Sequence, residues 1–132
     1  MILADTGFLV AAINEDDRNH RRSIEIAADL PPQYVTTWPC VTEALYLLGI
    51  PPAQERLFQQ VERGILRLYE PTLADAIRAF DLMRRYADTP MDFADASLVV
   101  AAEILKITSI LTFDSHFYAY RINDTIPFEL LP

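Results

Sequence analysis

The stretch Asp92-Phe93-Ala94-Asp95-Ala96-Ser97-Leu98-Val99-Val100-Ala101-Ala102-Glu103-Ile104-Leu105, followed soon after by Ser109-Ile110-Leu111-Thr112, decides the fold class. Two acids lie in the opening turn of the first stretch, and the apolar run around and after them predicts a buried helix from Asp92 to Leu105. The second stretch is short and apolar, which predicts a buried strand ending at Phe113-Asp114. A buried helix joined to a buried strand is typical of α/β proteins with a parallel sheet.

The rest of the chain repeats this alternation of short strands and longer helices. We expect strands at residues 2–4, 34–36 and 65–69, and a last edge strand at residues 126–131. We expect helices at residues 8–13, 17–30, 39–48 and 53–63, and a fifth helix that opens at Thr72. Gly64 is expected to end the fourth helix, and Thr72 with Asp75 to cap the fifth. The sequence therefore predicts one α/β domain, residues 1–132, with a mostly parallel sheet.

Helical periodicity also predicts which side chains of two helices face the core. The expected set is Ile24, Ala27 and Ala28 in the second helix, and Ala76, Ile77, Phe80 and Met83 in the fifth.

The composition describes a chain that can build its own core. Of the 132 residues, 52% are hydrophobic and only three are glycine, so part of the apolar surface is expected to be buried against another chain. Cys40 is the only cysteine, which excludes an intrachain disulfide. The apolar start lacks the basic residues of a signal peptide, and no window reaches the roughly 20 apolar residues that span a bilayer. We therefore expect no membrane association and a cytoplasmic location.

The net charge of −8 argues against nucleic-acid binding, because such proteins normally carry a basic surface. Two features weaken this objection. Four acids gathered in one site would contribute four of the negative charges, and bound cations would offset them. The basic residues are almost all arginine, which suits bidentate phosphate contacts. They include two clusters, Arg18 with Arg21 and Arg22, and Arg84 with Arg85.

Two acids follow predicted strands that lie far apart in the sequence. Asp5 comes directly after residues 2–4, and Asp114 follows the strand that ends near Thr112. Because ligands of parallel sheets bind outside the carboxyl ends of the strands, we expect both acids at one edge of the sheet. Each acid also has an ordinary structural explanation, since Asp5 can cap the next helix and Asp114 can start a short one.

Two further acids lie in apolar helices. Glu43 stands within Val41-Thr42-Glu43-Ala44-Leu45, where a lone glutamate is commonly a solvated surface residue. Asp92 and Asp95 fall in the first turn of their helix, where the helix dipole favours negative charge. A cap explains Asp92 well but explains Asp95 less well, because the residues around Asp95 look buried. Clustered carboxylates suit Mg²⁺ or Mn²⁺, and such a cation can mediate attack on a phosphodiester.

At these positions the sequence resembles the PIN domain family, and within it the toxins of VapBC-type toxin–antitoxin pairs. The most specific matches are Pro90-Met91-Asp92-Phe93-Ala94-Asp95-Ala96 and Ile110-Leu111-Thr112-Phe113-Asp114-Ser115-His116-Phe117. Leu3-Ala4-Asp5-Thr6 and Thr42-Glu43 are similar to two weaker family motifs. The resemblance implies a three-layer α/β fold and a catalytic, metal-binding set formed by Asp5, Glu43, Asp95 and Asp114.

The resemblance further implies a ribonuclease toxin that acts on RNA with Mg²⁺ or Mn²⁺. It also implies a homodimer and a cognate antitoxin protein. Thr6 and Thr112 are expected to hydrogen-bond to the acids. Asp92 could be an additional outer ligand or only a helix cap.

Other interpretations compete with this one. Asp5-Thr6-Gly7 is the tripeptide of aspartic proteases, but those enzymes are all-β and this chain is mostly helical. A phosphate-receiver domain would need a lysine near its aspartates, and Lys106, the only lysine, is misplaced for that role. The main alternative is a non-catalytic binding module on the same fold, although such a module has no need of all four acids.

Two histidines and three aromatic residues have alternative expected roles. His20 is expected on a solvated helix face, and His116 at a helix start or near substrate. Trp38, Tyr118 and Tyr120 are candidates for stacking on bases, with core or partner packing favoured for Trp38.

Overall fold

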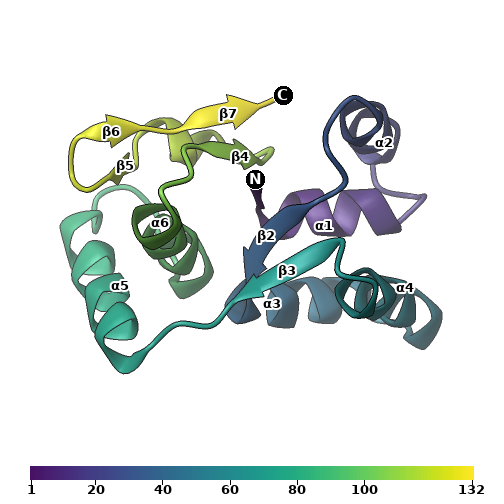
Figure 1. Cartoon of the computed structure of the whole chain (residues 1–132), viewed down its shortest axis with the longest axis horizontal. Helices are drawn as coiled ribbons and strands as arrows, with labels where there is room; N and C mark the ends of the chain where they lie inside the picture. Colours follow the sequence, from purple (N-terminus) through teal and green to yellow (C-terminus); the bar gives the residue numbers. More distant parts are fainter.

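The computed structural model describes residues 1–132 and has a parallel β-sheet at its centre (Figure 1). Its strands are β1 (Ile2–Ala4), β2 (Tyr34–Thr37), β3 (Leu66–Tyr69), β4 (Ser109–Leu111) and β7 (Glu129–Leu131). Their order across the sheet is β3-β2-β1-β4-β7, and each neighbouring pair is parallel. All five strands therefore end at the same edge of the sheet, where residues that follow different strands can meet.

Six helices flank the sheet: α1 (Thr6–Ile13), α2 (His20–Ala28), α3 (Trp38–Leu48), α4 (Pro51–Glu62), α5 (Leu73–Arg85) and α6 (Phe93–Leu105). The helices α5 and α6 lie on one side, whereas α1, α3 and α4 lie on the other with α2 against α1 (Figure 1). The expected three-layer α/β fold with a parallel sheet is confirmed. No helix combines the length and the apolar character needed to cross a membrane.

The sheet divides the apolar core into two clusters, because successive side chains of a strand point to opposite faces. The cluster beneath α5 and α6 includes Leu3, Val35 and Ile110, and the cluster beneath α1, α3 and α4 includes Ala4 and Leu111. The helix α6 is buried along most of its length, as its apolar sequence predicts.

Local sequence signals fix the helix ends as expected. Thr72 and Asp75 form a capping box at the start of α5, and Asp92 and Asp95 form another at the start of α6. Each box satisfies backbone amides that the first helical turn leaves free. Gly64 adopts φ +74° just beyond the end of α4, where a left-handed conformation suits glycine.

The prediction for the second helix is partly wrong. The helix α2 is shorter than expected, and its Ile24 is 47% exposed, while Ala28 is also exposed. Ser23 is the buried residue of this helix. The reason is that α2 packs on α1 instead of on the sheet, so only a narrow stripe of it is covered.

The predicted inner face of the fifth helix is also partly wrong. Ile77 and Phe80 are 58% and 49% exposed, whereas Ala79 and Leu82 are buried. The small Ala79 side chain allows α5 to lie close to α6. The helix therefore has two apolar stripes, and the one with the larger side chains is left uncovered.

The single edge strand expected at residues 126–131 is divided in two. The first part, β6 (Ile126–Pro127), pairs antiparallel with β5 (Arg121–Ile122), and the second part is β7. Phe128 separates them, because its side chain is buried against Phe117 in the core. Phe117 belongs to a 3₁₀ helix, η1 (Ser115–Tyr118), that follows β4.

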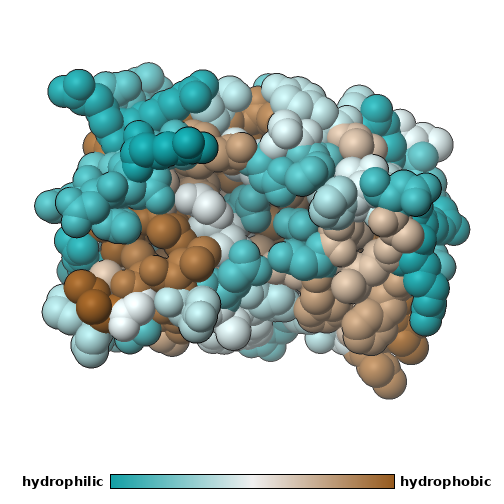
Figure 2. Space-filling model, turned by 180° about the vertical axis from the view of Figure 1, so that it is seen from behind, coloured by the Kyte–Doolittle hydropathy of each residue, from teal (hydrophilic) through white to brown (hydrophobic).

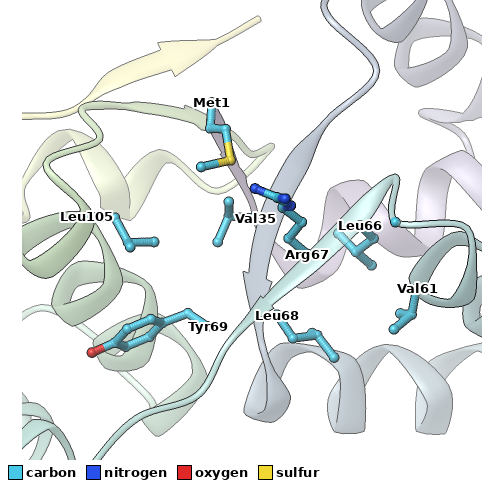
Figure 3. A pocket seen from close by; sticks show the side chains of 9 residues that line it. Met1, Val35, Val61, Leu66, Arg67, Leu68, Tyr69 and Leu105 are labelled. Atoms are coloured by element: carbon cyan, nitrogen blue, oxygen red, sulfur yellow. The ribbon is translucent and has the colours of Figure 1, made fainter.

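An apolar hollow of about 460 Å³ lies at the outer edge of β3. Figure 3 shows Met1, Val35, Tyr69 and Leu105 around it, with Arg67 as its only charged side chain. Because no carboxylate, histidine or cysteine lines it, this hollow lacks the side chains that usually bind metal ions.

Candidate active site

Asp5 is held at the carboxyl end of β1 by two hydrogen bonds. One carboxylate oxygen accepts the backbone N–H of Thr6 at 2.7 Å, and the other accepts the hydroxyl of Thr112 at 2.8 Å. The side chain is only 6% exposed. Asp5 therefore caps α1, as its ordinary structural explanation predicts, and also presents a buried carboxylate at the edge of the sheet.

Asp114 reaches the same edge from β4. Its backbone N–H donates to the hydroxyl of Thr112 at 3.0 Å, so one threonine positions both Asp114 and Asp5. Its Oδ1 accepts the backbone N–H of His116 at 2.9 Å and lies 2.7 Å from His116 Nδ1. This carboxylate is therefore fixed at the start of η1.

Asp95 comes from the first turn of α6. Its carboxylate accepts the backbone N–H of Asp92 at 3.2 Å, and its own N–H donates to the Asp92 carboxylate at 2.8 Å. This capping box holds the Asp95 side chain at the amino end of the helix, on the same side as the ends of β1 and β4.

The fold brings three of the four expected acids together. Asp5, Asp95 and Asp114 each offer a carboxylate oxygen, and these oxygens lie within 4.8 Å of one another. Glu43 lies farther out, on α3, and lines the same hollow of about 290 Å³ together with Asp92. The four acids thus border one hollow, with three forming a tight cluster and Glu43 beside it.

The electrostatics of the hollow are strongly negative. Burial raises the pKa of Asp5 from 3.8 to about 6, and the charges of Asp114 and Glu43 contribute in the same direction. Burial and the neighbouring Asp92 charge also raise the pKa values of Asp95 and Glu43. No lysine or arginine lines this hollow to balance the acids. Proton uptake or a bound cation would relieve their repulsion.

The donor set fits a hard divalent cation. All available ligands are carboxylate oxygens, which Mg²⁺ and Mn²⁺ prefer. The hydroxyl of Thr6, next to Asp5, is buried and has no hydrogen-bond partner within the chain. Cys40 is buried, accepts the Thr37 hydroxyl at 3.3 Å and does not line the acidic hollow, so its thiol is not among the available ligands.

Other residues singled out in the sequence lie as follows. His20 is half-buried, and its Nδ1 lies 2.7 Å from the Ala11 carbonyl oxygen, which corrects the expectation of a solvated side chain. Tyr120 is fully buried and hydrogen-bonds to the Pro90 carbonyl, so it cannot stack on a base. Trp38 is 41% exposed beside Glu43. Lys106 ends α6 away from the acids, as expected.

Sequence reasoning missed the threonines at the end of β2. Thr36 donates its hydroxyl to the Ala4 carbonyl at 2.8 Å, which fixes the end of β1 just before Asp5. Thr37 is hydrogen-bonded to Ser97 of α6 at 2.6 Å, which ties that helix to the sheet two residues after Asp95. The available signal was a pair of polar residues at the end of an apolar strand.

The comparison with known families identifies the class of the chain. A model of the PIN domain family matches residues 2–123, so the chain belongs to the PIN domain family. No curated protein sequence matches it significantly.

Three solved structures show the same fold at low sequence identity. VapC20 of Mycobacterium tuberculosis, described as a sarcin–ricin loop cleaving toxin, has a TM-score of 0.85 at 22% identity, covering 96% of this chain and 100% of that one. A toxin–antitoxin complex from Klebsiella pneumoniae gives 0.68 at 16% identity, covering 87% and 88%. FitAcB from Neisseria gonorrhoeae gives 0.61 at 18% identity, covering 98% and 97%. The chain therefore has the fold of VapC toxins.

Proposed function

We propose that this protein is a metal-dependent endoribonuclease and the toxin of a toxin–antitoxin pair. The observation that carries the proposal is the cluster formed by Asp5, Asp95 and Asp114, whose oxygens lie within 4.8 Å. Three structural elements converge to hold these acids, and no basic side chain lines their hollow. Such an arrangement costs stability unless a cation is bound, which is expected of a site kept for function.

The fold supports RNA as the substrate. VapC20, which has the same fold over nearly the whole chain, is described as cleaving the sarcin–ricin loop. Hydrolysis of a phosphodiester requires a nucleophile near a phosphorus atom and relief of charge on the phosphoryl oxygens. Since Cys40 is buried and does not line the acidic hollow, we assign the role of nucleophile to water. We propose a cytoplasmic location to match an RNA substrate.

In this mechanism the chain's own residues orient the reactants. Asp5, Asp95 and Asp114 would hold Mg²⁺ or Mn²⁺, with Glu43 beside them to orient the attacking water. A cation there would neutralise the acids, polarise a phosphoryl oxygen and lower the pKa of water. Thr112 keeps two of these carboxylates aligned through its hydroxyl.

Glu43 is the group best suited to activate the attacking water. It lies outside the three-acid cluster but lines the same hollow, so its carboxylate is available for proton transfer. In the metal-free protein, burial and the Asp92 charge raise the pKa of Glu43. Glu43 would take a proton from water as the oxygen attacks phosphorus. The phosphorus–oxygen bond to the leaving nucleotide would break, and the leaving oxygen would take up a proton from solvent.

The direct test is cleavage of RNA by the purified protein. A pool of structured RNAs is incubated with and without Mn²⁺, and the new ends are mapped by sequencing. We expect discrete Mn²⁺-dependent cuts that disappear with EDTA and with the Asp5→Asn variant. Cutting that is equally strong in Asp5→Asn, purified in the same way, would contradict the proposal and point to a contaminating nuclease.

A groove between α1, α2 and α4 is proposed as the binding place of the antitoxin. Its volume is about 260 Å³, and almost all of its lining is apolar, including Leu9, Ile13, Ile24 and Leu57. A similar fold occurs in a toxin–antitoxin complex, which supports a protein partner. This groove lies toward the end of α1 away from Asp5, beside the starts of β2 and β3, and it shares no lining residue with the acidic hollow.

A second apolar surface is proposed to form the homodimer. We define the α3–α5 surface as Leu73, Ile77 and Phe80 of α5, Phe93 of α6, and Trp38 and Tyr46 of α3. The side chains of Leu73, Ile77 and Phe80 follow one another along an exposed helix stripe, and the ring of Phe80 lies 5.4 Å from that of Phe93. Apolar areas lie on both sides of the face seen in Figure 2, including the side of α5. Large exposed apolar patches commonly mark interfaces.

A further inference from the structure

A second, smaller hollow adjoins the acidic one. It has a volume of about 150 Å³, and the residues that line it include Arg22, Thr112, Phe113, Asp114, Ser115 and Tyr118. The acidic hollow is also lined by Phe113 and Asp114, so the two lie on either side of this segment. A nucleic-acid strand with one phosphate in the acidic hollow can therefore continue into the second hollow.

Arg22 is the only basic residue that lines either hollow. It lies on the exposed side of α2 and forms no ion pair or hydrogen bond within the chain. The neighbouring Arg21, in contrast, faces Glu25 at 4.0 Å and does not line the hollow. An unpaired guanidinium beside a carboxylate cluster is well placed to attract an anion that approaches the cluster.

Resting on the proposed function, we infer that this hollow is a binding site for the RNA nucleotide next to the cleaved bond. Arg22 binds the phosphate that flanks the scissile one. Bidentate hydrogen bonds from a guanidinium suit a phosphate group. This contact also explains how an acidic protein can hold a polyanion, because the cation in the acidic hollow and Arg22 would each balance one phosphate.

Tyr118 provides the second part of the same subsite. Tyr118 is 65% exposed and lines the hollow together with Arg22. The Tyr118 carbonyl accepts Arg121 Nη1 at 2.7 Å, which holds the backbone of η1 at this point. An exposed aromatic ring on a fixed backbone suits stacking with a base. The hollow thus combines a phosphate contact with a stacking surface, which are the two groups that recognise a single-stranded nucleotide.

The test compares Arg22→Gln with Arg21→Gln, which removes the same charge from the adjacent position of α2. Both variants are first checked for an unchanged melting temperature. Steady-state cleavage of a single-stranded oligoribonucleotide, built around a mapped cut, is then measured in Mn²⁺ at several salt concentrations. We expect Arg22→Gln to raise KM about tenfold with little change in kcat. The slope of log KM against the logarithm of the salt concentration should fall by about one, because one phosphate contact is lost. Arg21→Gln should behave like the wild type.

A chemical probe identifies the phosphate itself. Oligoribonucleotides that carry one neutral methylphosphonate linkage beside the cut are cleaved by wild type and by both variants. We expect the neutral linkage to raise KM for the wild type and for Arg21→Gln, but to have no further effect on Arg22→Gln. This inference alone would be overturned if the wild type shows Mn²⁺-dependent cleavage but the neutral linkage changes KM equally for Arg22→Gln and Arg21→Gln. Absence of Mn²⁺-dependent cleavage by the wild type would overturn the proposed function and, with it, the subsite.

Discussion

Replacing Asp5 with asparagine should stabilise the metal-free protein while it abolishes activity. Burial raises the pKa of Asp5 from 3.8 to about 6, so the ionised carboxylate is less favourable in the folded chain than in the unfolded one. With about 1.36 kcal/mol per pKa unit, ionised Asp5 lowers the free energy of unfolding by about 3 kcal/mol. An asparagine side chain is uncharged, so the variant does not lose this part of the free energy of unfolding.

The size of the effect depends on pH in a defined direction. The folded-state pKa lies above the unfolded-state value, so the stability that protonated Asp5 contributes is present below pH 4 and is lost as the pH rises to about 6. Asparagine weakens the contact with Thr112 at every pH, which costs about 1 kcal/mol. We therefore expect Asp5→Asn to be less stable than wild type by about 1 kcal/mol at pH 4 and more stable by about 2 kcal/mol above pH 7.

The assay is urea unfolding in EDTA between pH 4 and pH 8, with Asp88→Asn as a control that removes an exposed carboxylate. For a chain of 132 residues, a gain of about 2 kcal/mol in the free energy of unfolding would also raise the melting temperature in thermal unfolding by roughly 7 °C. The control should show no pH-dependent difference from wild type. A difference between Asp5→Asn and wild type that stays constant across this pH range would refute the reasoning.

Three further predictions concern other parts of the molecule. Glu43→Gln should keep the fold and reduce kcat for RNA cleavage about a hundredfold, because it removes the proposed base; an unchanged kcat would exclude that role. Ile77→Glu should convert a dimer into a monomer in sedimentation experiments, while Ile104→Glu, on another exposed position, should not; equal masses for both variants would reject the α3–α5 surface. Leu98→Ala should lower the free energy of unfolding by about 2–5 kcal/mol, because Leu98 is fully buried in α6; a loss below 1 kcal/mol would contradict the packing described for this helix.

Much of the fold could be predicted because local signals agree with the global arrangement. The capping boxes at Thr72 and Asp92 and the apolar runs of β1, β4 and α6 each specify one element. The edge of the sheet at which Asp5 and Asp114 meet follows from parallel strand order alone. These predictions did not require knowledge of how helices pack against one another.

The remaining features depend on tertiary packing, which a single sequence does not display. Ile24 and Ile77 have the same periodicity as core residues, yet both are exposed because α2 covers only α1 and α5 approaches α6 through Ala79. The same limit applies to the site. Sequence reasoning grouped Glu43 equally with the aspartates, whereas the structure places it beside the tight cluster. Its place depends on the packing of α3 against α1 and α6.

Binding of Mn²⁺ to the purified protein, followed by electron paramagnetic resonance of the free ion, addresses the central idea most directly. Wild-type protein should remove Mn²⁺ from solution saturably at neutral pH, and Asp114→Asn, which keeps an oxygen acceptor for His116, should bind at least tenfold more weakly. If the two proteins took up Mn²⁺ equally, the gathered aspartates would not be a metal centre, and the enzyme described here would lack its chemistry.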